Sequence, residues 1–364
     1  MLKSHKRFAS SVPSAIGILL IAFLTLSCGD DATGPNDGSS ANFQQAALSI
    51  TETDVGTHVG VLAHDSMLGR WSPSPQLNDA ADYIASEFSR AGLRPGNNGE
   101  LLQWFALPVA QVVPGLYVRV DSGAGPGVPL SIQTPILGGP VPGDPGGEVV
   151  APNVIGWIEG SDPQLNHEYI VFSAHFDHIG TAPIASPTGD DVYNGADDNA
   201  SGTAALLEIA EAFGSLRTAP ARSVVFIATS GEERGLIGAL YYTNHPTFPL
   251  ENAIANLNLD MIGRNDPATV NVIRQSNSTL GELVQAVAAL HSDIGVSPID
   301  VPDDSLVRRS DCFAFLLAGI DALFFHSGMH DDYHGLDDEP ERLDAGKTAA
   351  VARLAYWVGV ELVN

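Results

Sequence analysis

The chain has 364 residues, of which 44% are hydrophobic, and this is enough to form the core of one large α/β domain or of two smaller domains. Acidic residues outnumber basic residues by 43 to 17, which gives a formal net charge of −26. Such a charge repels phosphate groups, so the composition argues against a nucleic-acid partner and against adhesion to anionic membranes.

The first 27 residues have the composition of a secretory signal peptide. Three basic residues lie within the first seven positions, and an apolar run follows over 15–26. This run is too short to cross a bilayer comfortably. Cys28 stands at the expected cleavage site and predicts a bacterial lipoprotein with a lipid on its thiol, although Thr25 replaces the Leu usual in such signals. We therefore expect an exported protein, either anchored to the cell envelope only through Cys28 or released by ordinary cleavage.

The remainder is expected to consist of a linker and one folded domain. Residues 28–42 are rich in Gly, Asp and Ser and predict a flexible linker, and residues 43–364 form the domain, with a helical extension at its start. The segment 121–152 is dense in Gly and Pro and predicts a long loop or insertion. Cys312 is the only cysteine after Cys28 in the mature part, so it has no internal disulfide partner and is expected to be a small buried hydrophobic residue.

The predicted elements change character along the chain. Residues 43–64 and 76–91 are expected to be helical, and 101–120 has strand character. From residue 153 onward, strands and helices alternate, which predicts an α/β fold with a doubly wound, mostly parallel central sheet and helices on both faces. The strands are expected at 153–158, 169–174, 223–229, 257–261, 270–273 and 322–325, and the helices at 201–213, 235–242, 279–290, 311–318 and 344–362.

Two adjacent carboxylates, Asp197 and Asp198, lie in a Gly- and Asn-containing loop just before a predicted helix. One of them would be enough to cap that helix, since a carboxylate oxygen accepts hydrogen bonds from the first N–H groups. The second carboxylate is unexplained unless a cation lies near it. Our hypothesis is that Asp197 bridges two metal ions, whereas Asp198 caps the helix or shapes the loop.

Other imidazoles and carboxylates follow the ends of the predicted strands. The carboxyl ends of such strands meet at one edge of the sheet, where ligands bind. Lys347 is the only lysine after the signal segment, so we expect the cations that balance these carboxylates to come from outside the chain. Imidazole and carboxylate without thiolate suit Zn²⁺ in an open catalytic site. The side chains concerned are His175, Asp177, His178, Glu232, Glu233, Asp260, His326, His330 and His334.

Several motifs together resemble the co-catalytic di-zinc exopeptidase family, peptidase family M28. This family includes secreted bacterial aminopeptidases, and its relatives include glutamate carboxypeptidase II and the glutaminyl cyclases. The resemblance runs from about residue 50 to the end, with the motifs in the family's order. It implies a zinc-exopeptidase-like fold without the protease-associated domain of larger members, because 121–152 is too short to form one. The motifs are His175-Phe176-Asp177, the loop from Gly195 to Gly202, the segment from Ser230 to Gly238, Leu259-Asp260-Met261 and Tyr333-His334.

The resemblance implies two Zn²⁺ ions per chain and a role for each matching residue. Asp177 would orient the ring of His175 through its second nitrogen, and Glu232 would be the general base that takes a proton from the attacking water. His178 and His326 are expected to support the structure or the ligands. The five implied ligands are His175 and Asp260 on one ion, Glu233 and His334 on the other, and Asp197 on both.

Three further details concern the last metal ligand, the substrate pocket and the oxyanion. His330 competes with His334 for the last ligand position, and the Tyr-His pair favours His334. Cys312 stands where relatives commonly carry His after Ser-Asp, which concerns the substrate pocket rather than metal binding. Tyr193 and Tyr333 are the two candidates for stabilising the oxyanion.

The leading functional prediction is a zinc aminopeptidase that removes amino-terminal residues from peptides outside the cytoplasm. A glutaminyl cyclase would use a single zinc, and the intact bridging set argues against it. A carboxypeptidase would need basic residues to bind a free carboxylate, for which Arg264, Arg308 and Arg309 are candidates. A non-catalytic scaffold on the same fold would have lost metal ligands or the general base, and this chain keeps all of them. The sequence specifies neither the side-chain preference nor the oligomeric state.

Overall fold

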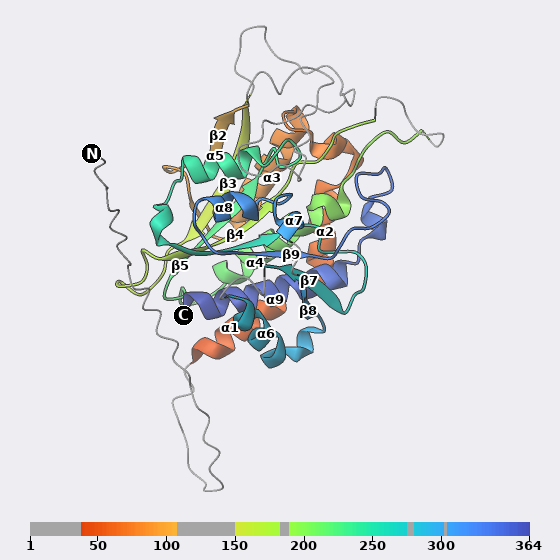
Figure 1. The fold of residues 1–364 in the computed structure, drawn as a ribbon. Helices are drawn as coiled ribbons and strands as arrows, with labels where there is room; N and C mark the ends of the chain where they lie inside the picture. Colours follow the sequence, from red (N-terminus) through yellow and green to blue (C-terminus); the bar gives the residue numbers. More distant parts are fainter. Residues whose placement is uncertain (1–37, 108–149, 183–188, 275–279, 302–303) are drawn as a thin grey trace, which may run out of the picture. The chain divides into compact units, whose positions relative to one another are not determined.

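The computed structural model describes residues 38–107, 150–182, 189–274, 280–301 and 304–364 (Figure 1). The predicted signal segment, Cys28 and nearly all of the Gly- and Pro-rich segment 121–152 lie outside these residues. The first helix begins at Gly38, so the end of the predicted linker 28–42 is helical. No helix in the described part of the chain is long and apolar enough to cross a membrane.

The strands of the described residues form one mixed sheet in the order β1-β3-β5-β4-β6-β9-β7-β8, with β2 pairing to β3 as well. The four central strands, β5, β4, β6 and β9, are parallel, while β3 and β7 run antiparallel to their neighbours in the centre. The expected α/β fold is thus confirmed. The strands are β1 (Arg94–Pro95), β2 (Leu102–Ala106), β3 (Val150–Ile158), β4 (Tyr169–His175), β5 (Ser223–Thr229), β6 (Ala253–Leu259), β7 (Thr269–Ile273), β8 (Ser297–Val301) and β9 (Ala322–His326).

Helices cover both faces of this sheet, with α1, α4, α6 and α9 on one side and α5 and α8 on the other (Figure 1). The residues of β4 and β5 alternate between the two sides, as expected of strands that are buried on both faces. Phe172 and Phe226 pack against Phe213 of α4, whereas Val171 and Val225 pack towards Tyr242 of α5. The helices are α1 (Gly38–Ser49), α2 (Glu52–Leu62), α3 (Pro75–Arg90), α4 (Gly202–Gly214), α5 (Ile237–Asn244), α6 (Leu280–Leu290), α7 (Asp304–Val307), α8 (Cys312–Leu317) and α9 (Ala345–Val363).

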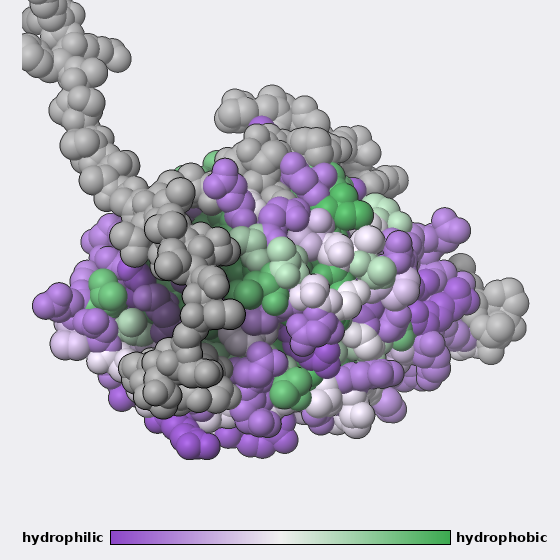
Figure 2. All heavy atoms as spheres, turned by 90° about the horizontal axis from the view of Figure 1, so that it is seen from below, coloured by the Kyte–Doolittle hydropathy of each residue, from purple (hydrophilic) through white to green (hydrophobic). Residues whose placement is uncertain are grey.

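The surface is consistent with the acidic composition. The face shown in Figure 2 is covered mainly by hydrophilic residues, with smaller groups of hydrophobic residues between them. The interior, in contrast, is built from apolar strands: every residue of β4 and of β5 is buried. Burial of these apolar strands is the main source of stability for such a sheet.

The carboxyl ends of the parallel strands bring the predicted functional residues to one edge. β4 ends at His175 and β9 ends at His326, while β6 ends one residue before Asp260. The loop that leads into α4 turns at Gly195, which has a φ of 58°. A Cβ atom at Gly195 would overlap the Asp198 carbonyl oxygen and the His178 ring, so only glycine fits this turn.

Candidate active site

Two clusters of metal-ligating side chains lie at this edge of the sheet. In each cluster the candidate ligand atoms all lie within 4.8 Å of one another. The side chains come from segments far apart in the sequence, so the fold rather than a local motif assembles them. The first cluster consists of His178, Asp198, Glu233 and His334, and the second consists of His175, Glu232 and Asp260.

The carboxylate of Asp198 lies between the two clusters. Its Oδ1 atom is 3.4 Å from Nε2 of His175 in the second cluster. Its Oδ2 atom is 3.1 Å from Nε2 of His334 in the first. His175 Nε2 also lies 3.5 Å from Asp260 Oδ1, and His334 Nε2 lies 3.2 Å from Glu233 Oε2. Asp198 therefore directs one carboxylate oxygen towards each cluster.

Asp197, which the sequence favoured as the bridging residue, faces away from both clusters. Its Oδ1 atom accepts a hydrogen bond of 2.7 Å from the Gly263 N–H, and its Oδ2 atom lies 3.2 Å from His330 Nε2. Asp338 accepts hydrogen bonds from the main-chain N–H groups of both Asp197 and Asp198 and so fixes the turn between them. The sequence favoured Asp197 as the bridging residue, but Asp198, which was expected to cap the helix or shape the loop, is the aspartate that lies near both clusters.

Asp177 lies between His175 and Glu232. Nδ1 of His175 is 3.2 Å from the Asp177 main-chain oxygen and 3.7 Å from its Oδ1 atom. The same Oδ1 atom accepts a hydrogen bond of 3.1 Å from the Glu232 N–H. Asp177 is thus beside the second nitrogen of His175, as expected, but it also ties the end of β4 to the turn after β5.

Glu232 and Glu233 are neighbours in sequence but have opposite electrostatic environments. Burial raises the pKa of Glu232 well above its usual value, and the nearby carboxylates add to this effect beyond what His175 can offset. Burial also acts to raise the pKa of Glu233, but His334 and His178 outweigh it and hold that pKa well below its usual value. Glu232 is therefore suited to exchanging a proton, and Glu233 is suited to binding a cation.

The imidazoles of the two clusters respond to the surrounding carboxylates. Burial alone would lower the pKa of His334, but Glu233 and Asp198 raise it to about 11. The pKa of His175 is likewise raised well above its usual value, with Glu232 and Asp260 outweighing burial. The clusters thus attract positive charge, and their imidazole and carboxylate donors fit Zn²⁺.

Arg70 is a buried cation behind the site that the sequence did not reveal. Its guanidinium is fully buried and donates to the main-chain oxygens of Leu62 and Phe176, at 2.5 and 2.7 Å. It donates to those of Asn194 and Gly195 at 2.7 and 3.0 Å. Burial lowers its pKa to about 10, although Asp177, Asp198 and other carboxylates oppose that shift. Arg70 is thus a cation of the chain near these carboxylates, but its guanidinium binds main-chain oxygens and not the carboxylates themselves.

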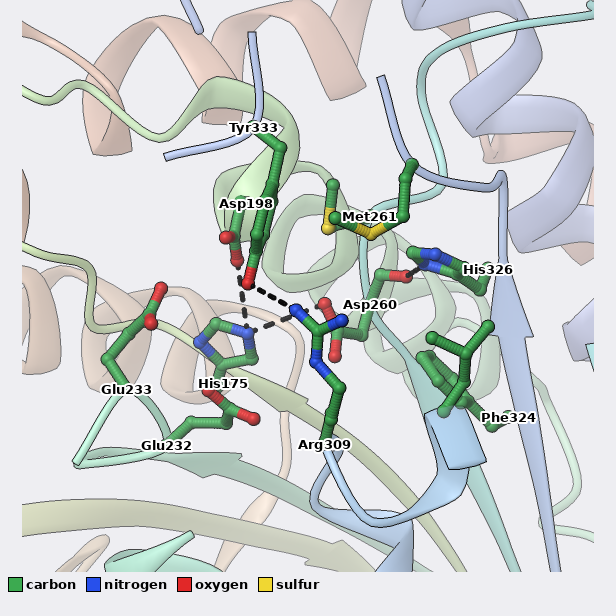
Figure 3. A pocket seen from close by; sticks show the side chains of 12 residues that line it. His175, Asp198, Glu232, Glu233, Asp260, Met261, Arg309, Phe324, His326 and Tyr333 are labelled. Atoms are coloured by element: carbon green, nitrogen blue, oxygen red, sulfur yellow. Dashed lines mark hydrogen bonds and ion pairs between the residues drawn. The ribbon is translucent and has the colours of Figure 1, made fainter. Parts of the chain in front are cut away.

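A pocket opens over the two clusters (Figure 3). Its floor is polar, and the rest of its wall is largely apolar. Arg309 reaches over this pocket and donates a hydrogen bond of 3.0 Å to Oη of Tyr333. Tyr193 is not among the lining residues, so Tyr333 is the better placed of the two tyrosine candidates. The outer wall consists of Met261, Leu306, Arg309, Phe324, His326, Met329 and Tyr333.

The remaining candidates lie around the clusters rather than within them. His330 contacts Asp197 and belongs to neither cluster. Cys312 is fully buried among apolar residues, and burial raises the pKa of its thiol to about 12, as expected of a small hydrophobic residue. Its neighbour Asp311 accepts a hydrogen bond from the Thr229 hydroxyl. Burial raises the pKa of Asp311 to about 7.

Comparisons with known proteins show the family of this chain. The model of peptidase family M28 matches residues 153–358, more than half of the chain. A probable zinc metalloprotease of Pyricularia oryzae is 35% identical over 237 residues, covering 62% of this chain and 38% of that protein. Aminopeptidase YwaD of Bacillus subtilis is 29% identical over 192 residues, covering 49% of this chain and 38% of that protein. The chain thus spans only about two fifths of the length of these relatives.

A solved structure shows the same fold. BSAP, a zinc aminopeptidase from Bacillus subtilis, matches with a TM-score of 0.64 at 18% sequence identity. The match covers 86% of this chain and 96% of that protein.

Proposed function

Since the chain belongs to peptidase family M28, and since one carboxylate lies between two ligand clusters, we propose that it is a zinc-dependent aminopeptidase that binds two Zn²⁺ ions. The single observation that supports a pair of ions is the position of Asp198, which presents a different oxygen to His175 and to His334. Its substrates are peptides with a free amino terminus.

We assign the ligands from the two clusters. His175 and Asp260 would hold one ion, Glu233 and His334 would hold the other, and Asp198, in place of Asp197, would serve both. When bound, a zinc pair lowers the pKa of a coordinated water and polarises the scissile carbonyl group. His178 supports Glu233, since its Nδ1 atom lies 3.0 Å from Glu233 Oε1.

Two side chains act on the reacting groups. Glu232 lines the pocket and is the general base: it takes the proton of the attacking water and gives it to the leaving amine. Burial raises the pKa of Glu232 in the metal-free protein, and a bound zinc pair would oppose that shift and keep the carboxylate ionised, ready to accept the proton. Tyr333 accepts a hydrogen bond from Arg309, so its own hydroxyl proton is free to be donated to the developing oxyanion.

The test is an assay on the metal-loaded protein with aminoacyl-4-nitroanilides. We expect turnover that disappears on chelation and returns with Zn²⁺, with two zinc ions per active chain by elemental analysis. Amino-terminally acetylated substrates are the control and should not be cleaved. Turnover that survives chelation contradicts the proposal. One zinc per chain with pyroglutamate formed from amino-terminal glutamine indicates a cyclase, and release of carboxyl-terminal residues indicates a carboxypeptidase.

We also propose that the protein is exported and carries a lipid on Cys28. The support is the basic, apolar and small-residue pattern over 1–28. Mass spectrometry of the mature amino terminus is the measurement. A diacylglyceryl group on Cys28 is the expected result, whereas an unmodified terminus beyond Cys28 contradicts lipidation.

A further inference from the structure

The outer wall of the pocket changes from buried residues at one end, called the inner end, to exposed residues at the rim. Met261, Phe324 and His326 are each only 3% exposed, whereas Met329 on the rim is 43% exposed. Met261 and Phe324 give this end of the wall an apolar surface, which adjoins the imidazole of His326 and the Asp260 carboxylate of the floor. Figure 3 shows that His326 lies beside Asp260 and Met261, away from Glu232 and Glu233.

His326 has one ring nitrogen in use and one without a partner. Nδ1 lies 2.9 Å from the main-chain oxygen of Asp260. A carbonyl oxygen only accepts hydrogen bonds, so Nδ1 carries the proton, and in the neutral ring Nε2 is an acceptor. Nε2 is buried and has no hydrogen-bond partner among the described residues.

A buried acceptor without a partner is costly, and such groups are rare in folded proteins. The proposed catalytic groups do not use this nitrogen, since His326 belongs to neither ligand cluster. Its ring packs against Phe324, with the ring centroids 5.1 Å apart, and this contact fixes its orientation. His326 therefore lines the pocket next to Met261 and Phe324, with its ring held in place and its Nε2 atom without a partner among the described residues.

We propose that His326 is a specificity residue, and that the pocket selects an amino-terminal side chain that is uncharged and ends in an O–H or N–H donor to Nε2 of His326. This inference rests on the proposed aminopeptidase function. The wall formed by Met261 and Phe324 disfavours charged side chains, because burying a charge beside apolar groups is costly. The substrate's ammonium group is better matched by the carboxylates of the pocket floor than by this imidazole.

The experiment compares substrates of nearly equal shape that differ in one donor. The pairs are the nitroanilides of Tyr and Phe, Thr and Val, and Gln and Met. For each pair, kcat/KM is measured with the wild-type zinc enzyme and with three variants. H326F keeps a ring without nitrogen, H326Q keeps an acceptor near the position of Nε2, and H245F is the control at a histidine outside the pocket.

In the wild type, at least one donor-bearing side chain should be preferred over its apolar partner. H326F should reduce that preference by about tenfold, the effect of one lost hydrogen bond in a desolvated site. H326F also removes the hydrogen bond to the main-chain oxygen of Asp260, so the ratio of kcat/KM within each pair is the readout and not either value alone. H326Q should restore part of the preference, and H245F should leave it unchanged.

Other results contradict the inference. If H326F loses activity equally on both members of every pair, His326 has only a structural role. Unchanged ratios in both H326F and H326Q show that Nε2 contacts no substrate donor. If H326F does not fold, the H326Q ratios and product inhibition of the wild type by the same free amino acids decide the question. Cleavage without any pair preference refutes this inference alone, whereas no cleavage of any nitroanilide refutes the proposed function as well.

Discussion

Asp198 and His175 face each other across the boundary between the two ligand clusters, with Oδ1 of Asp198 3.4 Å from Nε2 of His175. The other oxygen of Asp198 is directed to His334 at 3.1 Å. No other carboxylate of the described residues has ion pairs with both of these histidines. Asp197, one residue earlier, instead binds the main chain at Gly263. Two adjacent and chemically identical residues thus have different surroundings.

The first prediction separates these two aspartates. Asp198→Asn should leave the fold intact but remove the shared carboxylate, so zinc content should fall below two per chain and kcat/KM should fall by at least about 10³. Asp197→Asn is the matched control, because it keeps an oxygen that can accept from Gly263 and should retain both ions. Elemental analysis and nitroanilide kinetics measure the difference. Full metal content in the Asp198 variant, together with metal loss in the Asp197 variant, would restore the original assignment.

The second prediction concerns the adjacent glutamates. Glu232→Gln should reduce kcat by about 10²–10⁴ while both zinc ions remain bound, because it removes a general base and not a ligand. Glu233→Gln should lower zinc affinity instead, since Glu233 lies in the cluster with His178 and His334. Competition with a zinc-binding dye compares the affinities. Near-normal turnover by the Glu232 variant would exclude it as the base.

Much of the fold could be predicted from the sequence because the central strands are long apolar runs. Residues 223–229 were expected as a buried strand, and β5 has the same bounds. β8 (Ser297–Val301) was missed: it contains Pro298 and Asp300 and lies at the edge of the sheet, where the apolar signal of a strand is weak.

The sequence predicts which types of residue form the site, but it does not predict the orientation of every side chain. The choice between Asp197 and Asp198 depends on the turn that holds them, and Asp338, 140 residues beyond Asp198, fixes that turn through two N–H groups. Arg70 was missed for the same reason. Its partners are main-chain oxygens from distant segments, and these leave no trace in the spacing of side chains.

The third prediction follows from the raised pKa values. A group whose pKa is raised in the folded state contributes stability below its unfolded pKa, and this contribution is lost as pH rises through the folded pKa. For His334 the contribution is complete below about 6.5 and is lost towards about 11. The zinc-free protein should therefore lose stability between pH 7 and pH 10. The zinc-loaded protein should lose less over this range, because bound zinc replaces the protons.

Calorimetry of both forms at several pH values measures this difference. Zinc removal should lower Tm at every pH, since a ligand bound only to the folded state stabilises it. The gap between the two forms should widen as pH rises from 7 to 10. A gap that is constant or narrows with pH would show that the histidines of the two clusters do not take up protons when zinc leaves.

The fourth prediction concerns Arg70, which stabilises the loops behind the site. Arg70→Met should leave four main-chain oxygens without their donor and remove a buried positive charge near Asp177 and Asp198. We expect a loss of about 3–5 kcal/mol in the free energy of unfolding, as for other broken buried charge networks. Arg94→Met is the control: the Arg94 side chain is 59% exposed beside Glu159, so its loss should cost less than about 1 kcal/mol.

Urea unfolding of the zinc-free forms isolates this effect from metal binding. Lysine at position 70 should recover only part of the stability, because a single ammonium group cannot donate to four oxygens in different directions. Zinc affinity should also change, since the loop from Asn194 to Gly195 that receives two of these hydrogen bonds leads directly to Asp198. Equal stability of the Arg70 and Arg94 variants would mean that water replaces the guanidinium, and the loop then does not depend on it.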